Sequence, residues 1–240
     1  IFPDHYPAGQ KMTAIPAIAT VIPAAGVGKR MKADKPKQYL PLCGVTVLEQ
    51  TLRRLKQVAA LQQFYLALSP DDPYFPTLPL ATDSGIQRVD GGAERANSVL
   101  NALVQIDAKV YPWVLVHDAA RPVVRVSDIE LLIDSCIESN QGGILATPVR
   151  DTMKRGSDRV EHTVDRAGLW HAYTPQLFPT ALLRDALQQA LAQGVAITDE
   201  ASAMEWAGLP VLLVQGHADN IKITQAEDLA LAAFYLEHSI

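Results

Sequence analysis

Short apolar runs alternate along this chain with segments whose apolar residues recur at helical spacing, and this alternation constrains the fold most. Apolar runs of this length are typical of buried strands, and the amphipathic segments between them are typical of helices. We expect strands at residues 17–22, 64–68, 86–89, 113–116, 144–146 and 211–214, and helices at residues 45–60, 94–106, 129–139, 181–193, 199–207 and 225–237. The pattern predicts an α/β fold with a mostly parallel sheet and helices on both of its faces.

Residues 150–170 break this rhythm. They are polar and contain a turn signal, Arg155-Gly156-Ser157-Asp158, between two short stretches with strand character. We therefore expect a protruding β-hairpin arm at about residues 148–170. A two-stranded hairpin is only marginally stable on its own in water, so such an arm needs a partner and predicts a homodimer. A surface loop is the alternative.

The overall composition limits the class of protein. A length of 240 residues with 48% hydrophobic residues suits a single globular domain, which we place at residues 17–240 after a disordered leader or cloning remnant at residues 1–16. The net charge of −5 argues against a nucleic-acid binder, and no apolar run approaches the ~20 residues that a membrane span needs. The two cysteines, Cys43 and Cys136, have no metal-type spacing and fit a reducing, cytoplasmic location.

The first expected strand runs into a loop of small residues, PAAGVGKRM, at residues 23–31. This loop is not a P-loop, because its two glycines are too close together and no Ser or Thr follows Lys29. It is not a dinucleotide-binding motif either, because Met31 stands at the position of the third glycine. What remains is a concavity of backbone N–H groups that can bind an anion.

A basic segment continues from this loop. Five basic residues and one acidic residue lie within nine positions and give a local charge of +4. The basic residues are Lys29, Arg30, Lys32, Lys35 and Lys37, and the acidic residue is Asp34. Such a cluster at a strand end, where open α/β sheets bind ligands, suits a polyphosphate. A solvated basic face is the alternative.

Three further segments carry polar residues that suit a phosphate site. Asp118 directly follows an expected strand, where its carboxylate can hold Mg²⁺ together with nucleotide phosphates, and Arg121 can bind a phosphate with its guanidinium. A helix cap or a surface ion pair is the alternative. Residues 91–98 enter a helix and can either approach a ligand closely or only cap that helix. Asp219 near Lys222 is a second carboxylate beside a cation.

Other catalytic chemistries find little support. The sequence has no G-x-S-x-G motif and no histidine pair with zinc-ligand spacing. The scattered histidines are interpreted as structural, and these are His117, His162, His171 and His217.

Taken together, the motifs resemble one family. The chain contains PAAGVGKRM…KPKQYL, VDGGAERANSV, VHDAARP, PVRDTMKR, HTVDRAGLW, TPQ, TDEASA and DNIKIT in this order, from about residue 19 to residue 237. This set resembles the bacterial 2-C-methyl-D-erythritol 4-phosphate cytidylyltransferases. The resemblance implies a Rossmann-like nucleotidyltransferase fold and a homodimer with exchanged arms. It also implies transfer of CMP from CTP to methylerythritol phosphate with Mg²⁺, which releases pyrophosphate and serves isoprenoid synthesis by the non-mevalonate pathway.

The resemblance also assigns roles to residues. Arg30 and Lys37 would stabilise the transition state, and Asp118 and Asp219 would hold the metal. The nucleotide would contact Pro23, Ala24, Ala25, Gly26, Gly28, Arg30, Lys37, Gly92, Ser98, Asp118, Ala119 and Lys222. The second substrate would contact Asp118, Arg121, Thr152, Arg166, Thr174, Thr198, Asp219 and Lys222, with Thr152 and Arg166 coming from the partner's arm.

Two alternatives stay open. A cytidylyltransferase for another polyol phosphate, such as ribitol 5-phosphate, would share the CTP half of the site, although the arm motifs and Lys222 favour methylerythritol phosphate. A non-catalytic nucleotide-binding module on the same fold is expected to lack Lys37 or Asp118, and both are present.

Overall fold

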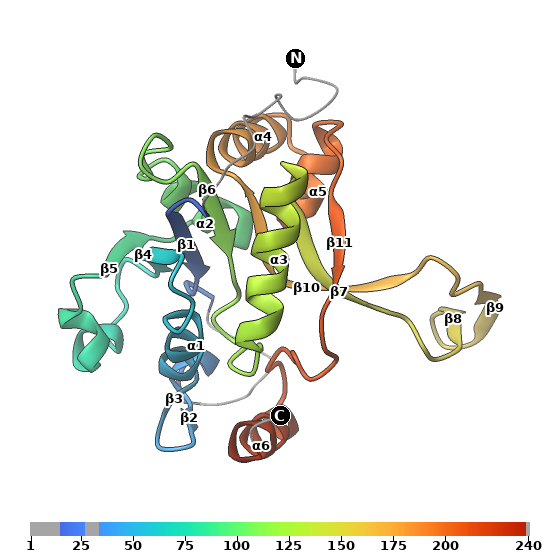
Figure 1. Cartoon of the computed structure of the whole chain (residues 1–240). Coiled ribbons are helices and arrows are strands. Elements are labelled where there is room, and N and C mark those ends of the chain that lie inside the picture. The colour runs from blue at the N-terminus through green and yellow to red at the C-terminus, as the bar shows by residue number, and fades with distance from the viewer. Residues whose placement is uncertain (1–14, 27–33, 239–240) are drawn as a thin grey trace.

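The computed structural model describes residues 15–26 and 34–238, and within them seven strands form one central sheet (Figure 1). The order of these strands is β11-β7-β10-β6-β1-β4-β5. Their bounds are β1 (Ile18–Pro23), β4 (Leu61–Leu68), β5 (Ile86–Asp90), β6 (Trp113–Val116), β7 (Gly143–Pro148), β10 (Trp170–Pro179) and β11 (Leu212–Gln215). β10 runs antiparallel to β6 and β7, and the other neighbours are parallel. The sheet is therefore mostly parallel, as predicted.

Helices cover both faces of this sheet. α1 (Val47–Leu55) and α3 (Val126–Ser139) pack on one face. The opposite face carries α2 (Arg95–Leu103), α4 (Thr180–Ala192) and α5 (Glu200–Trp206). Short 3₁₀ helices in the described residues are η2 (Lys37–Tyr39), η3 (Phe75–Thr77) and η4 (Pro79–Thr82). Every helix in this part of the chain is too short or too polar to cross a membrane.

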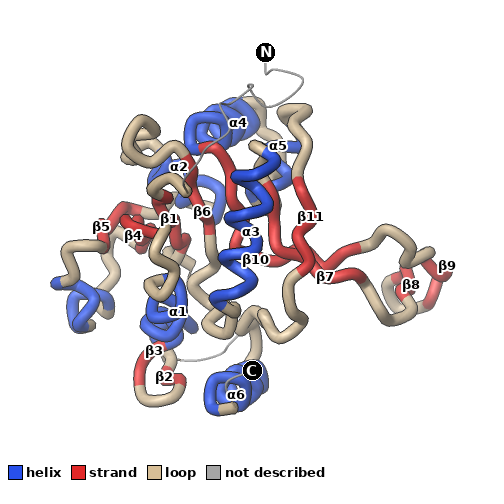
Figure 2. Tube along the Cα trace, in the orientation of Figure 1, coloured by secondary structure: helices blue, strands red, loops and turns tan. Residues whose placement is uncertain are grey.

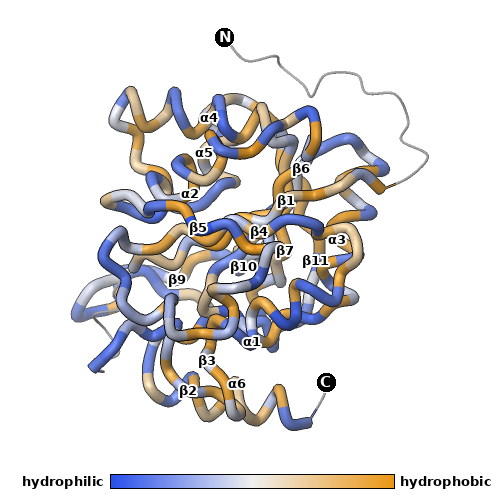
Figure 3. The backbone as a smooth tube through the Cα atoms, turned by 90° about the vertical axis from the view of Figure 1, so that its left-hand side faces the viewer, coloured by the Kyte–Doolittle hydropathy of each residue, from blue (hydrophilic) through white to orange (hydrophobic). Residues whose placement is uncertain are grey.

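The side chains of β1 show how one strand serves both faces. Ile18 and Ile22 pack into the apolar cluster with α1 and α3, whereas Ala19 and Val21 pack into the cluster with α2, α4 and α5. All four are fully buried, because successive side chains of a strand point to opposite faces and both faces are covered. In Figure 3 the hydrophobic stretches accordingly concentrate along the central strands.

A third apolar cluster anchors the C-terminal helix, α6 (Ala226–Glu237). Ile223, just before the helix, and Ala232 within it are fully buried in this cluster. The Ile223 N–H also donates to the carbonyl of Ala120 at 2.8 Å. These contacts hold the chain before α6 against the loop that follows β6, and so bring Lys222 beside Asp118.

The first expected helix and one strand of the central sheet differ from the sequence-based expectation. The helix expected at residues 45–60 ends at Leu55, and it begins after Thr46, which forms a capping box with Glu49. The ten-residue strand β10 was not expected. None of its first four residues is buried and they form no apolar run, so its strand conformation depends on pairing with β6 and β7. The leader expected at residues 1–16 lies outside the described residues except for its last two.

The arm is a hairpin, as predicted. β8 (Met153–Gly156) and β9 (Val160–Val164) pair antiparallel and project away from the central sheet (Figures 1 and 2). None of their side chains is buried. A smaller hairpin, β2 (Pro41–Leu42) with β3 (Val45–Thr46), precedes α1.

Candidate active site

A pocket of about 360 Å³ opens where β1, β5 and β6 end. The carboxyl edge of a parallel sheet is where open α/β folds bind ligands. The lining of the pocket includes most of the residues predicted to contact the nucleotide, and these are Pro23, Ala24, Ala25, Gly26, Lys37, Gly92, Ser98, Asp118, Ala119 and Lys222. Gly28 and Arg30, which belong to the same prediction, lie outside the described residues.

Residues 24–26, directly after β1, are held in place by Gln38 of η2. Its side-chain Nε2 donates to the carbonyl oxygens of Ala24 and Gly26 at 2.7 and 3.3 Å. The neighbouring Lys37 Nζ donates to the carbonyl of Ile223 at 2.8 Å. The described part of the small-residue loop, up to Gly26, and Lys37 therefore lie at one wall of the pocket.

A second wall is the turn before α2. The Gly92 N–H donates to Ser98 Oγ at 3.0 Å, and the Ser98 hydroxyl donates to the carbonyl of Glu94 at 3.1 Å. A Cβ at position 92 would overlap the side chain of Asn97, so this turn needs glycine for its close packing. Both predicted residues of this wall, Gly92 and Ser98, are thus tied to one another.

Asp118 is the buried centre of charge in the pocket. Its Oδ1 accepts from Arg95 Nε at 3.0 Å, and its Oδ2 accepts from Lys222 Nζ at 2.7 Å. Burial alone would raise the pKa of Asp118, but Arg95 and Lys222 outweigh burial and hold that pKa well below its usual range. The carboxylate is therefore ionised at neutral pH and anchors two cations on the pocket wall.

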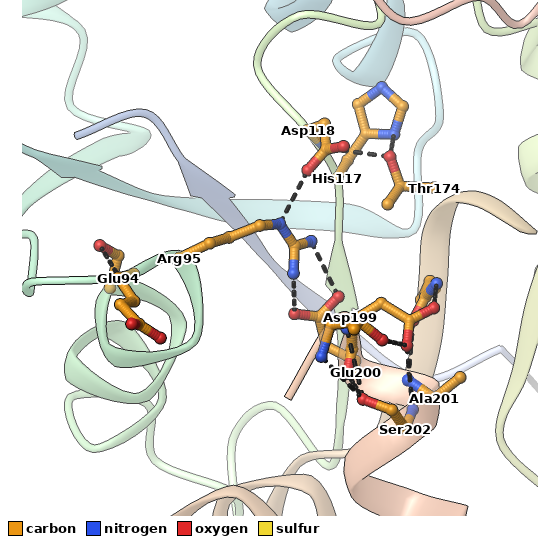
Figure 4. A network of polar contacts seen from close by, with 12 residues as sticks. Glu94, Arg95, His117, Asp118, Thr174, Asp199, Glu200, Ala201 and Ser202 are labelled. Atoms are coloured by element: carbon orange, nitrogen blue, oxygen red, sulfur yellow. Dashed lines mark hydrogen bonds and ion pairs between the residues drawn. The ribbon is translucent and has the colours of Figure 1, made fainter. Parts of the chain in front are cut away.

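A buried chain of hydrogen bonds connects the backbone of Asp118 to Thr174 and His117 (Figure 4). Thr174 Oγ1 accepts from the Asp118 N–H at 3.0 Å and lies 3.1 Å from His117 Nδ1. The carbonyl of Arg121, 3.0 Å from His117 Nε2, can only accept, so Nε2 carries the hydrogen and Nδ1 of the neutral ring accepts from the Thr174 hydroxyl. Burial lowers the pKa of His117 to about 4, so the ring is neutral at neutral pH. His117 is thus fully buried and does not line the pocket, which fits the structural role expected for it.

Of the remaining residues predicted to contact the second substrate, some lie beside Asp118 and others lie outside the pocket. Arg121 is buried, with its Nε 3.8 Å from Asp118 Oδ2. Thr174 is also buried and forms hydrogen bonds with Asp118 and His117. Thr198 is exposed before α5 and does not line the pocket. Thr152 and Arg166 are exposed at the base of the arm, also outside the pocket of their own chain. Their supply to a partner subunit stays a prediction.

Asp219 does not share the pocket of Asp118. Its Oδ2 accepts from Nε and Nη2 of Arg125 at 2.8 and 2.6 Å, and it lines a separate open cavity with Arg125, Arg150 and His217. The structure thus does not bring the two predicted metal carboxylates together. Within residues 15–26 and 34–238, no group of three His, Cys, Asp or Glu side chains is placed to hold a metal ion.

Sequence reasoning missed the pair of Arg95 and Glu200. Arg95 lines the pocket, and its Nη1 and Nη2 donate to the two Glu200 oxygens at 2.7 and 2.9 Å. Both residues lie inside the motifs GGAERANSV and TDEASA, yet 105 positions separate them. An acid in the first turn of a helix is ordinary in a sequence, so nothing there signals that Glu200 is buried against an arginine.

The arrangement can bind polyanions and stabilise growing negative charge. Lys37, Arg95 and Lys222 line one pocket, and preorganised cations of this kind act strongly in a partly buried site. The described lining contains no histidine or cysteine, so it offers no imidazole base or thiol nucleophile.

Comparison with known proteins gives one consistent result. A family model described as 2-C-methyl-D-erythritol 4-phosphate cytidylyltransferase matches residues 18–238. A protein of that name from Vibrio vulnificus is 58% identical over 224 residues, which are 92% of this chain and 94% of the relative. The protein of that name from Photobacterium profundum is 55% identical and covers 92% of this chain and 96% of its own length.

Solved structures agree. The Francisella tularensis 2-C-methyl-D-erythritol 4-phosphate cytidylyltransferase has a TM-score of 0.78 at 36% identity, covering 90% of this chain and 98% of its own. The enzyme of the same name from Thermus thermophilus has a TM-score of 0.77 at 32% identity, with coverage of 91% and 98%.

Proposed function

The chain belongs to the 2-C-methyl-D-erythritol 4-phosphate cytidylyltransferase family, and from that premise we propose that its reaction takes place in the pocket around Asp118. The enzyme transfers CMP from CTP to 2-C-methyl-D-erythritol 4-phosphate and releases pyrophosphate, a step in the synthesis of isoprenoid precursors. The observation that carries the location is the meeting of Lys37, Arg95 and Lys222 in one pocket with the Asp118 carboxylate.

The chemistry needs charge stabilisation more than it needs a base. A phosphate oxygen of methylerythritol phosphate is already a nucleophile, and it forms a new bond to the α-phosphorus of CTP. The bond from that phosphorus to the bridging oxygen breaks, and pyrophosphate leaves with the electron pair. The main obstacles are repulsion between two anions and the charge that grows on the leaving group.

Each wall of the pocket has a part in this proposal. The backbone at Ala24, Ala25 and Gly26 cradles the CTP phosphates, and Lys37 neutralises charge as pyrophosphate departs. Arg30 has the same proposed role on the basis of its motif. Gly92 and Ser98 face the cytosine side, and Lys222 lies between the nucleotide and the second substrate.

The donor set fits a magnesium ion that arrives with the nucleotide. Mg²⁺ is usually held by one or two carboxylates together with substrate phosphates and water, and the pocket offers Asp118 with Glu94 at its rim. Asp118 keeps lone pairs available beyond those used by Arg95 and Lys222. When bound, the ion would neutralise phosphate charge. Asp219, paired with Arg125, would need to change partners to take part.

We also propose a homodimer in which Thr152 and Arg166 reach the pocket of the partner subunit. The support is the arm itself, whose strands have no buried side chain within one chain. A cytoplasmic location is proposed because Cys43 and Cys136 are both free thiols.

A pyrophosphate-release assay with CTP tests the proposal. Methylerythritol phosphate should support turnover with Mg²⁺, and omission of the acceptor should abolish it. Ribitol 5-phosphate at the same concentration should react more slowly, and the opposite preference would contradict the substrate assignment. An absence of release with either acceptor would favour a nucleotide-binding module.

A further inference from the structure

Glu200 is a charged side chain in an unusual place. It is the first residue of α5, it is fully buried, and it does not line the pocket. A buried carboxylate costs stability unless a cation and hydrogen bonds compensate for the loss of water. The compensating cation is Arg95, whose side chain belongs to the pocket wall.

The guanidinium of Arg95 is held on two sides (Figure 4). Its Nη1 and Nη2 donate to Glu200 Oε1 and Oε2 at 2.7 and 2.9 Å, while Nε donates to Asp118 Oδ1 at 3.0 Å. A planar guanidinium bound through both Nη atoms cannot turn without breaking a charged hydrogen bond. Glu200 therefore fixes the direction in which Nε–H points at Asp118.

Glu200 is itself held rigidly, because the first turn of α5 is tied to β10. Gln176 of β10 donates through Nε2 to Asp199 Oδ2 at 2.9 Å and accepts from the Ala201 N–H at 2.9 Å. Asp199 also caps the helix by accepting from the Ser202 N–H at 3.0 Å. The position of Glu200 is thus set by the central sheet.

We propose that Glu200 is a positioning residue for the transfer reaction. It orients Arg95, Arg95 fixes Asp118 Oδ1, and the fixed carboxylate presents Oδ2 to Lys222 at 2.7 Å. This inference rests on the proposed role of Asp118. These contacts connect Glu200, which lies outside the pocket, to Arg95 and Lys222, the two cations that line the pocket where the CTP phosphates are proposed to bind.

The test compares Glu200→Gln with Arg95→Lys and with the double variant. Glu200→Gln keeps the size of the side chain but loses the negative charge and one hydrogen-bond acceptor. Arg95→Lys keeps the positive charge but loses the planar guanidinium that contacts Glu200 and Asp118 at the same time. Each single variant should lower kcat by about 10–100-fold, as loss of a supporting contact commonly does. Because both changes break the same contact, the double variant should be no slower than the slower single variant.

A matched control removes a different buried carboxylate. Asp128 is 3% exposed, accepts from the backbone N–H and Nδ1 of His217 at 2.9 and 2.8 Å, and does not line the pocket of Asp118. Asp128→Asn should lower the midpoint of thermal unfolding while kcat stays within about twofold of the wild type. If Glu200→Gln does not fold, Arg95→Lys and Glu200→Asp replace it, and both should show the same loss in kcat.

The outcomes separate this inference from the proposed function. Full activity of Asp118→Asn would overturn the proposed site itself. Loss of activity in Asp118→Asn together with wild-type kcat in folded Glu200→Gln would overturn the positioning role alone. A further loss of kcat when Glu200→Gln is added to Arg95→Lys would also overturn it, since Glu200 would then act independently of Arg95.

Discussion

The pocket and the arm of this molecule are built in opposite ways. In the pocket, Asp118 lies within 4 Å of cationic groups on Arg95, Arg121 and Lys222, and each of these contacts is made inside one chain. In the arm, no side chain of β8 or β9 is buried, and Val160 is 64% exposed.

The difference teaches where each part gets its geometry. The pocket is fixed by long-range contacts within the subunit, so its charges stay in place without a partner. A two-stranded hairpin with no packed face needs something outside its own chain to stabilise it. Changes in the pocket should therefore alter chemistry at constant assembly, and changes that distort the two strands of the arm should alter assembly while the sheet stays folded.

The largest expected effect is from Lys37→Ala. Loss of this cation should lower kcat by about 10²–10³-fold, the usual cost of removing one preorganised group that stabilises transition-state charge. Steady-state pyrophosphate release measures it. Lys109→Ala, at an exposed lysine outside the pocket, is the matched control and should keep wild-type kcat. Unchanged turnover in Lys37→Ala would remove the catalytic role.

The second prediction joins the two regions. An Arg166→Ala subunit keeps an intact pocket, and a Lys37→Ala subunit keeps an intact arm. If arms are exchanged, each mixed dimer has one complete site, so an equal mixture should recover about a quarter of wild-type activity. Each variant alone should be nearly inactive. Activity of the refolded mixture that stays at the level of the separate variants would show that the arm does not complete a neighbour's site.

The same contrast explains how much the sequence could predict. The loop after β1 and the residues after β6 follow apolar strands directly, so their meeting at one sheet edge follows from the parallel topology. This is why Ala24, Lys37 and Asp118 are found in one pocket, as expected. The arm was also predictable, because a polar segment with a central turn signal cannot be a core strand.

Long-range polar partners could not be predicted in this way. The pairing of Arg95 with Glu200 depends on α5 folding against β10, and β10 is itself paired with β6 and β7, which come from other parts of the chain. The pairing of Asp219 with Arg125 illustrates the same limit, because Arg125 comes from 94 positions away. Periodicity reports which face a residue occupies but not which distant side chain it meets there.

The third prediction compares a buried histidine with an exposed one. The pKa of His117 falls from an ordinary 6.5 to about 4 on folding, so between these values the unfolded chain binds more protons. The contribution of the neutral His117 ring to the free energy of unfolding should be fully present above about pH 6.5. The free energy of unfolding should then fall by on the order of 3 kcal/mol as the pH is lowered to 4. Urea unfolding at several pH values measures this. His117→Asn should flatten the dependence, whereas His162→Asn, exposed on the arm, should leave it intact.

The smallest expected effect concerns the arm alone. Gly156 has φ +155°, and a Cβ there would overlap the carbonyl oxygen of Arg159, so Gly156→Ala should cost the hairpin about 1–3 kcal/mol. Because no side chain of β8 or β9 is buried in its own subunit, this cost should appear in assembly. Analytical ultracentrifugation should show a higher dissociation constant for the Gly156→Ala dimer than for the wild-type dimer. The circular dichroism signal of the sheet and helices should persist.

The matched control for this variant is Gly168→Ala, outside the two strands. Gly168 also has a positive φ, +75°, but a Cβ there meets no atom within 4 Å. The control therefore shares the strain of a left-handed backbone and lacks the overlap with a neighbouring strand, so it should weaken the dimer less than Gly156→Ala does. Equal dissociation in both variants would show that the close pairing of β8 with β9 does not hold the dimer together.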